Sequence, residues 1–156
     1  MSGGWGRPVG RPFDGPEGTC VEVRSRAGDA YAVEVRGHQL HVDQPMVEGG
    51  SDTAPTPVEL FVGSLAASVA LHAGRFLARQ GIAEDAMVVR ASFRLSEEPP
   101  LRVEAVWVRV VVPRELPPGR LVGLREALER CTVTNTVRGA VRVDLEIDDY
   151  PSLAPG

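Results

Sequence analysis

The sequence contains no lysine: its seventeen basic residues are all arginine. A chain without lysine cannot form a Schiff base with a carbonyl substrate or hold pyridoxal phosphate through a lysine side chain, so both kinds of catalysis are excluded. Twenty-one acidic residues bring the net charge of the 156-residue chain to −4. Nothing in that balance points to a nucleic-acid partner.

Cysteine is also scarce. The chain has two, Cys20 and Cys131, which are too few for a disulfide framework or a structural zinc site. His38 and His41 lie three residues apart on an expected strand, so they point to opposite faces and do not form a metal-binding pair. We therefore expect no metal, no cofactor and a reducing, cytoplasmic setting.

Long hydrophobic runs are limited to one. Residues 58–73 are mostly apolar, but the run is shorter than a membrane span requires and includes Glu59 and His72. The first eighteen residues, rich in Gly, Pro and Arg, lack the apolar stretch of a signal peptide. We expect neither a signal peptide nor a membrane partner.

The length fits one domain of ordinary size. We expect a flexible arm at residues 1–18, a folded domain at 19–149 and a tail at 150–156. Within the domain, hydrophobic periodicity and turn residues predict strands at 19–26, 30–36 and 38–43, a helix from 57 to about 81, strands at 87–96 and 101–112, a helix at 117–131, one or two helical turns at 131–139 and a strand at 141–148. This order, β-β-β-α-β-β-α-(α)-β, defines an α+β fold.

Two side-chain patterns predict core positions. On the strand at 101–112, Trp107 shares one face with apolar neighbours and is expected in the core. On the helix at 117–131, one apolar stripe is made of Leu121, Leu124 and Leu128.

The central helix has a well-marked start. Thr56 is a favourable N-cap, Pro57 suits the first helical position, and Glu59 stands three residues after the threonine, which is the spacing of a capping box. From Val58 to Ala73 the helix is apolar nearly all round, so it should be buried on most sides. Since a small domain can seldom wrap one helix so fully, we expect a second copy of the chain to cover it.

Two segments carry a family resemblance. DQPMVEGGSDTAPTPVELFVGSLAAS at 43–68 and ALERCTVTNTV at 127–137 resemble the OsmC/Ohr family of bacterial hydroperoxide-stress proteins. The resemblance covers residues 20–148, nearly the whole domain. It implies an intertwined homodimer with central buried helices packed together and active sites at the interface between the two chains.

The chemistry implied by the resemblance uses two cysteines. The first, on the central helix, attacks the peroxide oxygen and becomes a sulfenic acid, and the second resolves it to a disulfide. Ser68 stands at the position of the first, peroxidatic cysteine, and Cys131 at that of the second, resolving cysteine. A serine hydroxyl has no sulfenic or disulfide state and is a weak nucleophile without a base.

The family also uses a Glu and an Arg to orient the first cysteine. The Glu directly follows a Pro in the family pattern, where this chain has Val58, and the carboxylate comes one residue later, at Glu59. At about 100° per residue, position 58 lies on roughly the same side of the helix as Ser68, while position 59 lies opposite. Glu59 therefore fits the cap better than the site. The orienting arginine stays open among Arg24, Arg26 and Arg36.

Four functional interpretations follow. In the first, the protein is a diverged member without two-cysteine peroxidase turnover, and it keeps an interface pocket near Val58 and His72 for a small apolar or peroxide-like ligand. In the second, it is a thiol-dependent peroxidase that uses Cys131 alone. In the third, Ser68 and His72, four residues apart on the helix, hydrolyse a substrate. In the fourth, Ser68 is an engineered replacement of the cysteine in an active hydroperoxide reductase.

Each of these residues also has a purely structural interpretation. Ser68 and His72 can pack in the core or against a second copy, and Cys131 can be a small buried apolar residue. Whether the chain is an enzyme therefore stays open at the level of its sequence.

Overall fold

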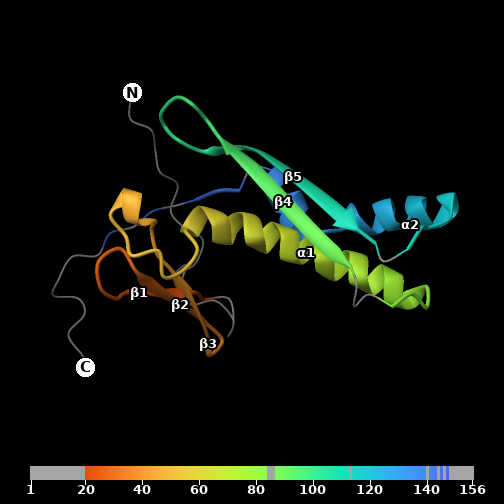
Figure 1. The fold of residues 1–156 in the computed structure, drawn as a ribbon, viewed down its shortest axis with the longest axis horizontal. Coiled ribbons are helices and arrows are strands. Elements are labelled where there is room, and N and C mark those ends of the chain that lie inside the picture. The colour runs from red at the N-terminus through yellow and green to blue at the C-terminus, as the bar shows by residue number, and fades with distance from the viewer. Residues whose placement is uncertain are drawn as a thin grey trace. The chain divides into compact units, whose positions relative to one another are not determined.

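The computed structural model describes residues 20–83, 87–112, 114–139, 141–143, 145 and 147. The elements in order are β1 (Glu22–Ser25), β2 (Tyr31–Val35), β3 (His38–Val42), the 3-10 turn η1 (Met46–Glu48), α1 (Pro57–Arg79), β4 (Val88–Leu95), β5 (Val103–Val111), α2 (Pro118–Leu128) and α3 (Thr132–Arg138) (Figure 1). This order confirms the predicted α+β fold. The expected arm at 1–18 and tail at 150–156 lie outside the described residues.

The chain divides into two compact units, residues 1–63 and 64–156. In the first unit, β1, β2 and β3 form an antiparallel sheet in that order. The turn between β2 and β3 consists of Arg36 and Gly37, which both have positive φ, 51° and 78°. A two-residue hairpin requires this backbone because its twist matches that of the strands. All three predicted strands are confirmed.

Asp43, directly after β3, organises the loop that leads to α1. Its side chain is buried, and its carboxylate accepts hydrogen bonds from the backbone N–H groups of Gln44, Ser51 and Thr53 and from the Thr53 hydroxyl at 2.7 Å. The Thr53 hydroxyl and then its N–H hold the pKa of Asp43 below the usual value, although burial opposes them. The Asp43 N–H donates in turn to the Pro55 carbonyl at 3.2 Å.

Gly50 lies where this loop closes on itself. A Cβ atom at this position would stand 2.0 Å from the Gln44 carbonyl oxygen and 2.8 Å from Asp43 Oδ1. No side chain fits in that space, so the second glycine of the GG pair is a packing requirement of the loop. The loop from Asp43 to Thr56, between β3 and α1, is called the motif loop below.

The start of α1 confirms the predicted capping box. The Thr56 N–H donates to Glu59 Oε2 at 2.8 Å, and the Glu59 N–H donates to Thr56 Oγ1 at 3.2 Å. The helix ends at Arg79, and Gly81, at φ 67°, provides the left-handed residue beyond its end.

The apolar run at 58–73 is shorter than a membrane span, but the helix α1 that contains it is long enough. Its 23 residues are long and apolar enough to cross a membrane by length and composition, although 39% of the most apolar window is buried within the chain. The core helix of a globular domain has the same properties. In the second unit α1 has this role, because three of its side chains, Ala73, Phe76 and Leu77, belong to the core.

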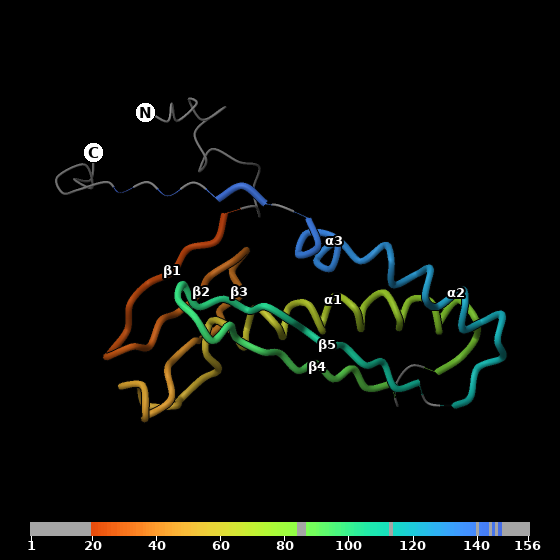
Figure 2. Tube along the Cα trace, turned by 90° about the horizontal axis from the view of Figure 1, so that it is seen from above, coloured from red at the N-terminus to blue at the C-terminus, as the bar shows by residue number. Residues whose placement is uncertain are grey.

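The second unit packs the C-terminal part of α1 between the β4–β5 hairpin and α2 (Figure 2). β4 and β5 pair antiparallel, with Arg90 opposite Arg109 and Ser92 opposite Trp107. The core is made of Ala73, Phe76, Leu77, Ile82, Leu116, Leu124 and Ala127, with Met87, Val110, Val112 and Leu128 packed against it. In the predicted stripe of α2, Leu124 and Leu128 take part in this core, whereas Leu121 is 40% exposed.

Trp107 is not a core residue in this chain: it is 54% exposed. The expectation was wrong because the strand face that carries Trp107 also carries Arg109, and the facing residues of β4 include Arg90. The opposite face, with Val110 against the core, is the one directed to α1. Alternation identified the two faces of β5 but gave the wrong one to the core.

The predicted last strand, 141–148, is not formed in the part of this range that the structure describes. Residues 141–143, 145 and 147 belong to no strand, and Val141, Val143, Leu145 and Ile147 are 60% to 95% exposed. A strand needs a neighbouring strand for its backbone hydrogen bonds, and none of the described strands pairs with this segment.

Candidate functional site

The structure brings Ser68 and Cys131 together. Ser68 lies in the middle of α1 and is half-buried, and Cys131 directly precedes α3 and is fully buried. The Ser68 Oγ and Cys131 Sγ atoms are 3.1 Å apart, a distance at which either group can donate a hydrogen bond. The two residues are 63 positions apart in the sequence, and the segment between them includes the β4–β5 hairpin and α2. The two positions therefore lie within contact distance in the single chain.

Polar neighbours act on the Cys131 thiol. Burial raises its pKa, but the Ser68 hydroxyl, the Thr134 hydroxyl, and the N–H groups of Thr134 and Val133 together outweigh burial, so the pKa lies below its usual value. The sulfur makes no N-cap hydrogen bond to α3. Of the polar groups around it, the Ser68 hydroxyl lowers the pKa of Cys131 most.

Thr134 is a site residue that the sequence analysis missed. It stands three residues after Cys131, at the distance where an N-cap side chain meets the first turn of a helix. The sequence CTVT, read as a cap followed by a short helix, contains this signal. Cysteine is an unusual cap, so the pattern does not stand out as the usual Ser, Thr or Asp would.

Glu59 and Val58 lie in the first turn of α1. The Glu59 carboxylate is held by the capping hydrogen bond to the Thr56 N–H, so its place in the structure is the helix N-terminus, as its position in the sequence indicated. Val58, at the position where the family has its Glu, is 37% exposed. An apolar side chain there can line a pocket, but it cannot orient a thiolate.

The remaining candidates show no catalytic arrangement in the described part of the chain. His72 is half-buried, and the hydrogen bond of the Ser68 hydroxyl goes to Cys131. Of the three candidate arginines, Arg24 forms an ion pair with Glu22, and Arg36 lies in the β2–β3 turn. Within the described residues, no three His, Cys, Asp or Glu side chains gather as a metal site. The role of each candidate stays a prediction.

The chemical capacity of the Ser68–Cys131 pair follows from its two atoms. Two thiols at these positions could be oxidised to a disulfide, whereas a hydroxyl and a thiol cannot. The hydroxyl can donate a hydrogen bond to a thiolate and so stabilise the deprotonated form. The pair therefore provides one polarised thiol and no internal partner that could resolve it.

Solved structures share this fold at low sequence identity. A protein of Psychrobacter arcticus, described as an osmotic-stress-induced and detoxification-response protein, is 17% identical, with a TM-score of 0.71 over 81% of this chain and 91% of that one. An organic hydroperoxide resistance protein of Legionella pneumophila is 20% identical, with a TM-score of 0.58 over 77% and 90% of the two chains. The organic hydroperoxide resistance protein OhrB of Bacillus subtilis is also 20% identical, with a TM-score of 0.54 over 83% and 98%.

A search of curated proteins finds no match. The family model described as OsmC-like protein matches residues 49–146, which include the GG pair of the motif loop, all of α1 and Cys131. A match over more than half of the sequence, together with the shared fold, shows that the chain belongs to the OsmC-like protein family.

Proposed function

We propose that this protein is a diverged OsmC-like protein without two-cysteine peroxidase turnover. The observation that carries the proposal is the 3.1 Å contact between Ser68 Oγ and Cys131 Sγ. It supports the assignment of the two positions to a cysteine pair, and one member of that pair has no sulfur. Peroxide reduction through a disulfide needs two thiols, so the reaction cannot close within one chain.

The same proposal includes a homodimer with a pocket at its interface for a small apolar or peroxide-like ligand. The exposure of apolar side chains on α1 supports it: Leu71 is 51% exposed and Val58 37% exposed in the single chain. Exposed apolar area costs about 25 cal/mol per Å², which favours a covering partner. A stable dimer of this kind should bury more than about 2,000 Å². Light scattering that finds a monomer at micromolar concentration would contradict this part.

The central experiment measures the consumption of an organic hydroperoxide with a thiol reductant. Every protein carries Cys20→Ser, because Cys20 is exposed and would react on its own. We expect Ser68→Cys to be about 10²-fold faster than the unmodified protein, and a further Val58→Glu to increase the rate again, because a positioned carboxylate assists the thiolate. Ala67→Cys, one residue away on an exposed part of α1, is the matched control and should show only the slow background reaction of an exposed thiol.

Two results would overturn the first proposal. If the unmodified protein is already fast and Cys131→Ala abolishes the activity, Cys131 is itself the peroxidatic thiol. If Ser68→Cys stays inactive even with Val58→Glu, the site is not that of a lost peroxidase, and the ancestry says little about present function.

The lowered pKa of the Cys131 thiol favours a second candidate, a one-cysteine peroxidase. The thiolate would attack one peroxide oxygen, the O–O bond would break, and the alcohol would leave with a proton, producing a sulfenic acid. Two molecules of an external thiol would then reduce it to the thiol, releasing water and a disulfide. Mass spectrometry after peroxide treatment should find about 16 Da added at Cys131 if this candidate is right. Oxidation at Cys20 alone would contradict it.

The setting proposed for either function is the cytoplasm. A lone thiol with a lowered pKa is oxidised readily, and the reducing pool of the cytoplasm would keep it in its thiol form. Hydrolysis by Ser68 and His72 has no observation in its favour, because the Ser68 hydroxyl forms its hydrogen bond with the Cys131 sulfur. If Ser68 were an engineered replacement, the natural protein would be a two-cysteine hydroperoxide reductase, and the first candidate would describe only the chain with Ser68.

A further inference from the structure

One face of the β4–β5 hairpin carries an unusual pair of like charges. Arg90 and Arg109 are directly opposite each other in the strand register. Like charges at opposed positions on one face destabilise a sheet, because their Cβ atoms stand about 5 Å apart. Neither arginine forms an ion pair with any residue that the structure describes. The chain as a whole is acidic, with a net charge of −4, so this concentration of positive charge is local.

Trp107 lies next to the arginine pair on the same face. It is opposite Ser92, two positions along the strands from Arg90 and Arg109, so the two pairs are neighbours on that face. The Arg94 guanidinium lies 5.6 Å from the centre of the indole ring and is itself paired with Glu104 at 2.6 Å. Arg94 is thus neutralised and holds the ring in place, while more than half of Trp107 stays exposed.

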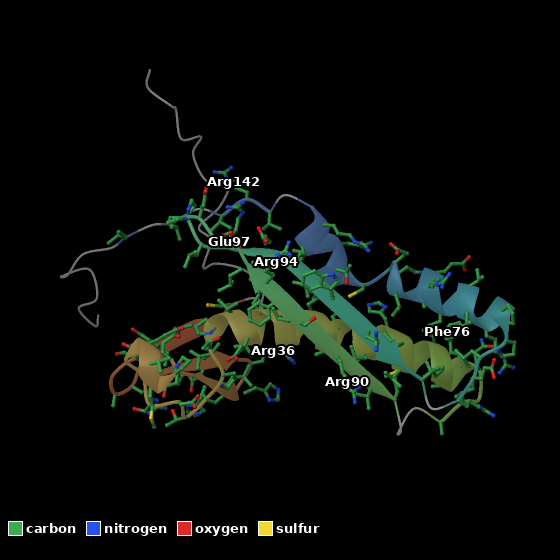
Figure 3. All side chains as sticks on the ribbon, turned by 45° about the horizontal axis from the view of Figure 1, so that its top comes forward. Arg36, Phe76, Arg90, Arg94, Glu97 and Arg142 are labelled. Carbon is green, nitrogen blue, oxygen red and sulfur yellow. The ribbon has the colours of Figure 1, made fainter. Side chains whose placement is uncertain are left out.

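These side chains surround a hollow of about 580 Å³ on the hairpin, lined by Arg90, Ala91, Ser92, Trp107, Val108 and Arg109. Figure 3 shows Arg90 and Arg94 near opposite ends of β4, so the ring of Trp107 lies between a free and a neutralised cation. The volume lies within the range of small-molecule sites, which is about 300–1,000 Å³. The hollow offers a ligand two guanidinium groups, one hydroxyl and one aromatic surface.

We propose that this hollow binds a small molecule that joins a phosphate group to a planar ring, as a nucleoside monophosphate does. Two guanidinium groups carry two positive charges, which match a phosphate dianion better than a carboxylate. Their planar donor forks suit phosphate oxygens, and the Ser92 hydroxyl adds a further donor. The ring would pack on the exposed part of Trp107. Binding would also remove the repulsion between Arg90 and Arg109. None of this depends on the redox state of Cys131.

The test is isothermal titration calorimetry of the full chain with AMP, phenyl phosphate, inorganic phosphate and adenosine. We expect AMP or phenyl phosphate to bind more tightly than inorganic phosphate, and adenosine to bind weakest, because only the first two supply both ring and charge. Arg109→Gln and Arg90→Gln should each weaken their binding by about tenfold, the loss of one good bidentate contact. Trp107→Leu should weaken binding of the ring-bearing ligands and leave inorganic phosphate unchanged.

Arg125→Gln is the matched control. Arg125 is exposed on α2 and its replacement removes the same charge, so it should leave binding unchanged. Equal weakening by Arg125→Gln would mean that net charge alone attracts the anion, and it would overturn the proposal. No binding of AMP or phenyl phosphate up to about 10 mM would also overturn it, because such affinities fall below those of specific sites. If the arginine variants change the oligomeric state and not ligand affinity, the face is a contact between copies and the proposal is wrong.

Discussion

The motif loop and the Ser68–Cys131 pair are held together in opposite ways. Every hydrogen-bond partner of Asp43 in the motif loop lies within twelve residues of it along the chain. Ser68 and Cys131 are 63 residues apart and meet only when α1, the hairpin and α2 have packed. The loop is therefore built by local hydrogen bonds, and the pair by the tertiary structure.

This difference means that membership of the family does not by itself imply the chemistry of a cysteine pair. The run that carries the resemblance, GGSDTAPTPVEL, performs structural tasks: Gly50 leaves room for the Gln44 carbonyl, Thr53 bonds to Asp43, and Thr56 and Glu59 cap α1. None of these tasks requires a thiol. A chain can keep all of them and replace a cysteine nine residues later, so the loop is evidence for the fold and not for peroxidase chemistry.

The largest effect in this comparison should come from Gly50→Ala. The new Cβ would stand 2.0 Å from the Gln44 carbonyl oxygen, so the motif loop would have to open. We expect a loss of at least about 2 kcal/mol in the free energy of unfolding, as for other strained substitutions. Gly63→Ala is the control, because no atom lies within 4 Å of its Cβ and alanine favours a helix. Urea denaturation of the two variants should separate them clearly, and equal stability would show that the loop is not tightly closed.

Ser68→Cys tests the tertiary half of the comparison. The thiol would stand close enough to Cys131 to form a disulfide on mild oxidation, and a bond across so long a loop typically stabilises by about 2–4 kcal/mol. Intact mass, which falls by about 2 Da, and the melting temperature with and without reductant measure the result. Ala67→Cys should form no such bond. A Ser68→Cys protein that stays reduced under oxidant would place the two backbones too far apart for a redox pair.

Asp43→Asn should change how stability depends on pH. Since hydrogen bonds lower the pKa of Asp43 in the folded state, its contribution to stability is present above its usual pKa of about 3.9 and is lost as pH falls through the folded value. We expect the unmodified protein to lose stability below about pH 4, and the variant to be less stable at pH 7 with a flatter acid limb. Melting temperatures from pH 7 to 2.5 provide the curve. Parallel curves for the two proteins would contradict the role given to the carboxylate.

Ser68→Ala should raise the pKa of the Cys131 thiol, because it removes the hydroxyl that lowers this pKa most, 3.1 Å from the sulfur. The alkylation rate of Cys131 by iodoacetamide, followed against pH in a Cys20→Ser background, should move to higher pH. Thr136→Ala is the matched control, since the Thr136 hydroxyl bonds to the Thr132 carbonyl within α3. An unchanged pH profile for Ser68→Ala would show that the Ser68 hydroxyl does not lower the pKa of the Cys131 thiol.

The smallest effect is expected at Glu59. Glu59→Ala should cost about 0.5–1 kcal/mol of stability through the lost half of the capping box, and Glu59→Gln should cost almost nothing, because glutamine makes the same hydrogen bond. Neither should alter the peroxidase rate that Ser68→Cys is expected to produce. A lower rate with Glu59→Gln would show that the Glu59 carboxylate acts in the site and not only in the helix cap.

Much of the molecule could be predicted where the determining contacts are local. The capping box, the left-handed Gly81 and the alternating strands of the two hairpins are patterns in which residues a few positions apart decide the structure. The exposure of Trp107 could not be predicted in this way, because alternation defines two faces of a strand and leaves open which face meets the core. For the same reason the sequence could not predict whether the segment 141–148 forms a strand, because an alternating segment becomes a strand only beside another strand.

The sequence by itself determined the family, the order of the elements and the absence of a second thiol at position 68, because each follows from residue identity or short-range geometry. Only the tertiary structure decided that the Ser68 hydroxyl meets the Cys131 sulfur. It also decided that Arg90 and Arg109 face each other beside an exposed Trp107. The physical reason is that such contacts join residues far apart in the chain, and their geometry depends on how whole helices and strands pack.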